Sequence, residues 1–120
     1  MDYDRYKLVR DKIPGVIEAD VNNRGQSEKC ERVLDITVYK HLLGEKLKEE
    51  TAELLDALAH GGLDSIENEL ADVHEVLVAI ADCYRCRDVV DLASEKAHKL
   101  GGFYQGFVLD VSTGVDRLQN

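Results

Sequence analysis

Apolar residues recur at helical spacing along two long stretches of the chain. In the first, from Asp35 to about Ala59, a stripe is formed by Ile36, Leu43, Leu47, Leu54 and Leu58. At about 100° per residue, these positions fall within about 40° of Leu47, which is typical of an amphipathic helix. Gly61 and Gly62 follow the stripe and predict its end, because glycine is common at helix C-termini.

A second helix is predicted from about Leu63 to Ala81. Its stripe consists of Ile66, Leu70, Val73, Leu77 and Ile80, and Val76, Val78 and Ala79 widen it. A helix that is apolar on more than one face must bury more than one face. We therefore expect it to lie centrally in a bundle or at a subunit interface, with the surplus apolar face around Val76 and Ala79 pairing with a second copy.

Shorter elements complete the prediction. Pro14 favours the first turn of a helix over about residues 12–22, and Gly101 with Gly102 ends another over about residues 88–100. Residues 103–111 look extended, and about 110–120 form a loose tail. Long helices with short connections predict an all-α, antiparallel four-helix-type bundle in a single domain, 1–120, completed by oligomerisation.

Composition narrows the classes of function. The chain has 120 residues with a net charge of −9, so most of its surface should repel nucleic acids. Its apolar runs are shorter than the ~18 residues of a membrane span, and its first residues lack an apolar signal. We therefore expect a cytoplasmic protein with neither a nucleic-acid nor a membrane partner.

Acidic residues form an i, i+3 pair on each long helix. Glu50 and Glu53 lie about 60° and 120° from Leu47, and Glu69 and Asp72 lie about 100° and 160° from Leu70. In an antiparallel packing these pairs can face each other across a groove. Four carboxylates that close repel unless a cation neutralises them, and Mg²⁺ and Mn²⁺ prefer such oxygen ligands.

Two alternatives to a magnesium site have to be considered. A di-iron bundle would need Glu-x-x-His, but the third residue after each leading glutamate is Glu53 or Asp72. Exposed glutamates at this spacing are also common on ordinary helices, and Lys46 with Glu50 makes a common i, i+4 pair. Spacing alone therefore leaves both a metal site and a solvated surface open.

The sequence around these carboxylates resembles a known superfamily. "EETAE" and, fifteen residues later, "ELAD" match the EExxE…ExxD signature of the all-α nucleoside triphosphate pyrophosphohydrolases, which include the MazG-like proteins, the dimeric dUTPases and phosphoribosyl-ATP pyrophosphohydrolase. "KLVRDKIP", the "KLxEE" segment at residues 46–50 and "GGF" at 101–103 resemble a branch of predicted house-cleaning pyrophosphatases.

The resemblance implies an enzyme with a small-molecule nucleotide substrate. Non-standard or excess (deoxy)nucleoside triphosphates would be hydrolysed between the α- and β-phosphates, giving a monophosphate and pyrophosphate. Glu50, Glu53, Glu69 and Asp72 would hold Mg²⁺, with Mn²⁺ as the alternative, and Glu49 would support them or orient water. It also implies a homodimer or, as an alternative, a tetramer.

Local cations are then needed for the phosphates in so acidic a chain. The candidate substrate-binding residues are Lys7, Arg10, Lys12, Lys46, Lys96 and Lys99. One departure is Leu100, which stands where relatives carry a basic residue before GGF. Two other functions stay open at this point, namely phosphoribosyl-ATP hydrolysis in histidine biosynthesis and a non-catalytic helical oligomeric regulator.

Overall fold

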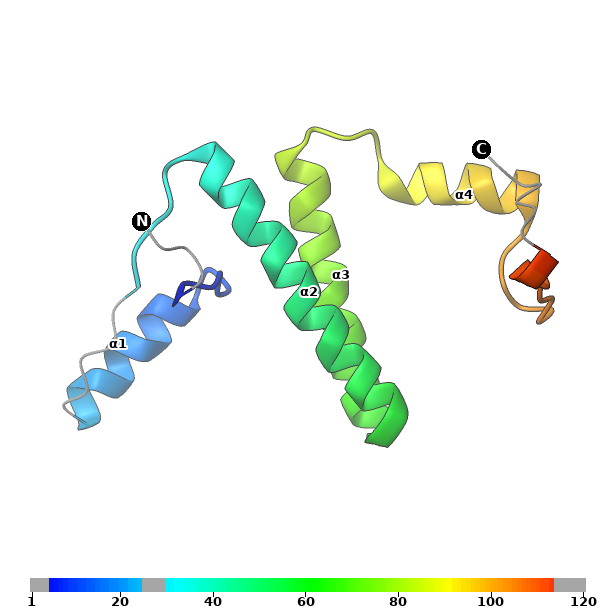
Figure 1. Ribbon diagram of the computed structural model, residues 1–120. Coiled ribbons are helices and arrows are strands. Elements are labelled where there is room, and N and C mark those ends of the chain that lie inside the picture. The colour runs from blue at the N-terminus through cyan, green and yellow to red at the C-terminus, as the bar shows by residue number, and fades with distance from the viewer. Residues whose placement is uncertain (1–4, 25–29, 114–120) are drawn as a thin grey trace. The chain divides into compact units, whose positions relative to one another are not determined.

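A computed structural model of the protein describes residues 5–24 and 30–113, and every regular element in these ranges is helical (Figure 1). The helices are α1 (Ile13–Arg24), α2 (Ile36–His60), α3 (Leu63–Cys83) and α4 (Val89–Leu100), followed by the 3₁₀ helix η2 (Val111–Thr113). The all-α prediction is confirmed, and the predicted bounds of all four α-helices lie close to those observed.

Local chemistry fixes both ends of α2. The carboxylate of Asp35 accepts hydrogen bonds from the backbone N–H groups of Thr37 and Val38, at 2.8 and 3.3 Å, and so caps the first turn. At the other end the N–H of Gly61 donates to the carbonyl of Ala57 at 2.7 Å. A Cβ at Gly61 would lie 2.9 Å from that same oxygen, so a side chain there would force the turn to shift. Two glycines therefore suffice to reverse the chain into α3.

The main packing in the described part of the chain joins α2 to α3, which run antiparallel and side by side (Figure 1). Its buried apolar residues are Leu42, Leu43, Ala57 and Val76. Leu43, Glu50 and Ala57 are all buried, and their seven-residue spacing is that of a coiled-coil seam. Glu50 therefore lies within the seam, at a position where such a helix pair ordinarily places an apolar residue.

The predicted apolar stripes are confirmed at Leu43, which is buried, but they are wrong at other positions. Leu58, Leu70 and Leu77, expected in the buried stripes, are 58%, 51% and 49% exposed. Val76, expected on the outer face, is only 8% exposed and packs in the core. The stripes predict a seam centred on leucines, whereas in the actual packing the carboxylate side of each helix turns toward the seam. Leu58, Leu70 and Leu77 are left on the outside as a result.

The chain forms two compact units, Met1–Cys86 and Arg87–Asn120. In the second unit the carboxylate of Asp88 caps α4 by accepting from Val90 N–H at 2.9 Å. Gly101 ends α4 with φ of 82°, a conformation that favours glycine. None of the described helices combines the length and apolarity that a membrane crossing requires.

Candidate metal and active site

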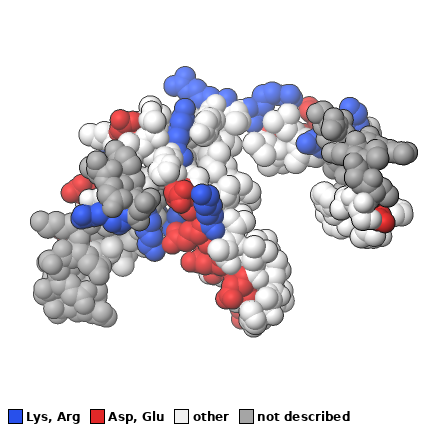
Figure 2. Space-filling model, viewed as in Figure 1, with Lys and Arg blue, Asp and Glu red and all other residues white. Residues whose placement is uncertain are grey.

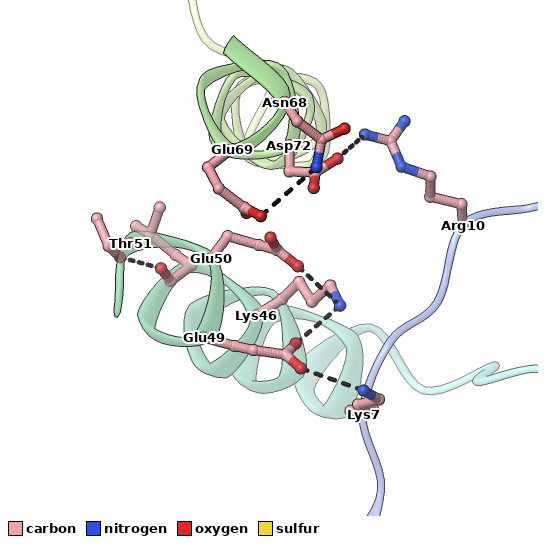
Figure 3. Close-up of polar contacts among 10 residues, drawn as sticks. Lys7, Arg10, Lys46, Glu49, Glu50, Thr51, Asn68, Glu69 and Asp72 are labelled. Atoms are coloured by element: carbon pink, nitrogen blue, oxygen red, sulfur yellow. Dashed lines mark hydrogen bonds and ion pairs between the residues drawn. The ribbon is translucent and has the colours of Figure 1, made fainter. Parts of the chain in front are cut away.

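The structure brings all five predicted carboxylates together midway along α2 and α3. One oxygen from each of Glu50, Glu69 and Asp72 lies within 4.8 Å of the other two. Glu49, Glu50 and Glu53 form a second group by the same measure. Glu50 belongs to both groups, and Figure 3 shows its side chain pointing toward Glu69 across the space between the helices.

Burial distinguishes this cluster from an ordinary acidic surface. The Glu50 side chain is 9% exposed, and its Oε2 is buried with no hydrogen-bond partner among the described residues. Oε2 of Glu69 is likewise buried without a hydrogen-bond partner among these residues. Its Oε1 accepts a hydrogen bond from Asn68 Nδ2 at 3.5 Å. An unpaired buried polar atom costs about 1–3 kcal/mol, and more when it carries charge. Exposed acidic clusters, which are common on helices, incur no such cost.

The residues present fit a divalent cation. Two carboxylates 4.8 Å apart repel by about 3 kcal/mol at an effective dielectric constant of about 20. That is a large part of the stability of a small domain. A hard cation held by oxygens of Glu50, Glu69 and Asp72 would remove this repulsion and give both orphaned oxygens a partner.

Glu53 experiences the negative charge of the cluster directly. Its pKa is raised by desolvation, and then by the nearby carboxylates of Glu50, Glu69 and Glu49. The side chain itself is exposed, so water can reach it from outside. It lies in the carboxylate group of α2, as predicted, but at the open edge of the cluster.

Glu49 differs from Glu53 because two ammonium groups hold it. Lys46 Nζ lies 2.7 Å from Glu49 Oε2, and Lys7 Nζ lies 3.2 Å from Oε1. The hydrogen bond from Lys46 lowers the pKa of Glu49 and outweighs desolvation, with Lys7 adding to the effect. Lys46 also lies 3.2 Å from Glu50 Oε1. Desolvation lowers the pKa of Lys46, but the hydrogen bonds to both glutamates outweigh it and leave the pKa raised.

Arg10 is the third cation at the carboxylate cluster. Arg10 Nη2 lies 2.7 Å from Asp72 Oδ1, on the opposite helix from Glu49 (Figure 3). The side chains of Lys7 and Arg10 are exposed, so water and salt screen both ion pairs. Figure 2 shows basic side chains beside an acidic stretch of the surface. Three of the predicted phosphate ligands therefore lie at the carboxylates.

The other predicted cations are Lys12, Lys96 and Lys99. Within the described residues, no ion pair joins Lys12 to the carboxylates. Lys96 and Lys99 are exposed on α4 in the second unit. Their role in phosphate binding stays a prediction. Asn68 was not predicted, because its contact with the adjacent Glu69 follows no helical spacing.

An antiparallel helix pair with carboxylates converging between its helices defines an all-α protein with a candidate divalent-cation centre. Comparison with known protein families identifies the family of this chain. The family described as MazG nucleotide pyrophosphohydrolase domain matches residues 39–100, and the chain belongs to this family. The match covers just over half of the chain and includes all five carboxylates. Comparisons with curated proteins and with solved structures found no match.

Proposed function

We propose that the protein is a Mg²⁺-dependent nucleoside triphosphate pyrophosphohydrolase. It cleaves non-standard or excess (deoxy)nucleoside triphosphates between the α- and β-phosphates, and the products are a monophosphate and pyrophosphate. Membership of the MazG family supports the class of reaction. The observation that carries the metal dependence is the pair of buried, unpartnered oxygens on Glu50 and Glu69.

The carboxylates differ in their proposed roles according to how deeply they are buried. Glu50, Glu69 and Asp72 are the inner ligands of Mg²⁺, and Glu53 adds a ligand from the exposed edge. Mn²⁺ would satisfy the same oxygens. When bound, the cation neutralises charge on the phosphates and positions a water molecule. Glu49 stays ionised between its two lysines and holds Lys46 beside Glu50.

The substrate's phosphates are expected at the side of the cluster where the cations lie. Lys46 presents a fixed ammonium group, and Lys7 and Arg10 reach the same carboxylates from the N-terminal segment. A nucleoside triphosphate carries several negative charges that an acidic chain would otherwise repel. The clustered cations offset that repulsion where the phosphates enter.

A substrate panel tests this proposal directly. Purified protein is incubated with standard and modified NTPs and dNTPs and with phosphoribosyl-ATP, with Mg²⁺ or with chelator, and the products are separated by chromatography. We expect metal-dependent monophosphate plus pyrophosphate. Diphosphate plus orthophosphate would mean that a different bond is cleaved, and turnover of phosphoribosyl-ATP alone would favour the histidine pathway. No turnover of any substrate would favour a non-catalytic regulator.

Two matched variants connect activity to the buried ligand. Glu50→Gln keeps the side-chain volume but removes a charged metal ligand, so we expect kcat/KM to fall by about 100-fold or more. Glu45→Gln makes the same chemical change at an exposed position of α2, where the glutamate pairs with Lys48. It should retain wild-type activity.

A further inference from the structure

The segment before α1, residues 5–12, contacts both helices of the site. Lys7 pairs with Glu49 of α2 at 3.2 Å, and Arg10 pairs with Asp72 of α3 at 2.7 Å. These partners are separated by 42 and 62 residues in sequence. Figure 3 shows both side chains extending from one stretch of chain at the edge of the carboxylate cluster.

The cations of the cluster fall into two kinds. The Lys46 side chain is 18% exposed and contacts two carboxylates from within α2. The side chains of Lys7 and Arg10 are 69% and 55% exposed, and each has one carboxylate partner within residues 5–24 and 30–113. Exposed ion pairs with a single partner exchange easily, because water and other anions compete for both groups. Lys46 is therefore a fixed cation, and Lys7 and Arg10 are exchangeable ones.

The net charge of the cluster indicates when Lys7 and Arg10 would leave their carboxylate partners. Five carboxylates and three cations leave a formal charge of −2, which one divalent cation neutralises. A cation bound to Asp72 competes with Arg10 for the same carboxylate. Once it is bound, Lys7 and Arg10 are no longer needed to offset repulsion among the carboxylates. Phosphate oxygens are then the stronger partners for both.

We propose that residues 5–12 form an exchangeable strap across the site. Without metal, Lys7 and Arg10 hold Glu49 and Asp72. With Mg²⁺ and a phosphate-bearing ligand bound, both side chains transfer to phosphate oxygens, and the strap closes over the ligand. The identity of that ligand rests on the proposed function, whereas the exchange rests on the two ion pairs.

The strap predicts two effects of opposite sign in one variant. In Lys7→Ala/Arg10→Ala, Mg²⁺ alone should bind about 2–5-fold more tightly, because two competing positive charges are gone. Inorganic pyrophosphate, added at saturating Mg²⁺, should bind at least ~10-fold more weakly, because it loses two charge-assisted contacts. Isothermal titration calorimetry of the full chain measures both constants. A variant that only damaged the fold would weaken both.

Arg5→Ala is the matched control for loss of positive charge in the same segment. Arg5 lies over the ring of Tyr6, 5.2 Å from its centroid, and among the described residues no ion pair joins it to the cluster. Hydrogen–deuterium exchange of residues 5–12 should rise with Mg²⁺ alone and fall when pyrophosphate is added. Weakening of both constants together, or changes no larger than those of Arg5→Ala, would overturn the strap.

The outcomes separate this proposal from the proposed function. If the wild type shows the predicted exchange but hydrolyses no nucleotide, the strap stands and the enzymatic proposal fails. If the wild type hydrolyses nucleotides while the double variant binds Mg²⁺ and pyrophosphate as the wild type does, only the strap fails. A wild type that binds no divalent cation overturns both.

Discussion

Two glutamates four residues apart on α2 respond oppositely to pH. The pKa of Glu49 is lowered, chiefly by the hydrogen bond from Lys46, so its stabilising effect is present above the unfolded pKa and is lost as pH falls through the folded value. The pKa of Glu53 is raised by desolvation and by neighbouring carboxylates. Its stabilising effect is present below the unfolded pKa and is lost as pH rises through the folded value.

Removing the charge of each glutamate should therefore change the stability of the metal-free protein in opposite directions. In chelator at pH 7, Glu53→Gln should raise Tm by about 1–4 °C, a small effect because the side chain is exposed. Glu49→Gln should lower Tm, because Lys46 and Lys7 lose their partner. Calorimetric scans from pH 7 down to pH 4 should show both differences shrinking as the wild-type carboxyls become protonated.

The same variants test the ligand set. Glu53→Gln should abolish metal-dependent hydrolysis while keeping the helical circular dichroism of the wild type. Full activity in this variant would remove Glu53 from the ligands. A fall in its metal-free Tm would show that repulsion within the cluster does not act on Glu53.

At the scale of the elements, the sequence predicts where the two long helices lie and which carboxylates face each other. The glycine pair and the apolar periodicity give the bounds of α2 and α3, and the i, i+3 spacing gives the facing carboxylates. Periodicity does not give the rotation of each helix, because Leu70 and Glu69 are neighbours and only packing decides which one turns inward. Nor can spacing show that Arg10 reaches Asp72, since that contact depends on the path of the segment before α1.

The inward position of Glu50 is expected to lower the stability of the metal-free protein while providing a metal ligand. Glu50 occupies the seam between Leu43 and Ala57, so Glu50→Leu would replace a buried, half-paired carboxylate with an apolar side chain of similar volume. Such replacements often stabilise by about 1–4 kcal/mol. We expect Tm in chelator to rise and the stabilisation by added Mg²⁺ to vanish, both measured by thermal denaturation.

Glu45→Leu is the control for this effect. Glu45 is exposed on the same helix and pairs with Lys48, so the same substitution there removes no buried charge. It should leave both the metal-free Tm and the response to Mg²⁺ close to those of the wild type. A destabilised Glu50→Leu protein would mean that the carboxylate, with Lys46, stabilises the seam even without metal.

At the scale of the whole molecule, the inward turn of the carboxylates has a consequence for assembly. Leu70, Leu77 and Val78 on α3 are about half exposed, and the described core has only four buried apolar residues. A helix with such a face needs a covering surface. We propose that a second copy supplies it and that the protein is a homodimer, with a tetramer as the alternative. The face predicted around Val76 and Ala79 is thus replaced by one that contains Leu77 and Val78.

Leu77→Glu tests that assembly. A charge placed in a self-complementary interface occurs twice in a two-fold dimer and loses its hydration in both copies, so the dimer should dissociate. Light scattering after size exclusion should give about twice the 13.4 kDa chain mass for the wild type and a single chain for the variant. Leu34→Glu makes the same change at a residue 85% exposed before α2 and should stay dimeric.

A monomeric wild type, or a Leu77→Glu protein of wild-type mass, would contradict this interface. Unchanged helical circular dichroism in the variant would show that dissociation, and not unfolding, produced the single chain.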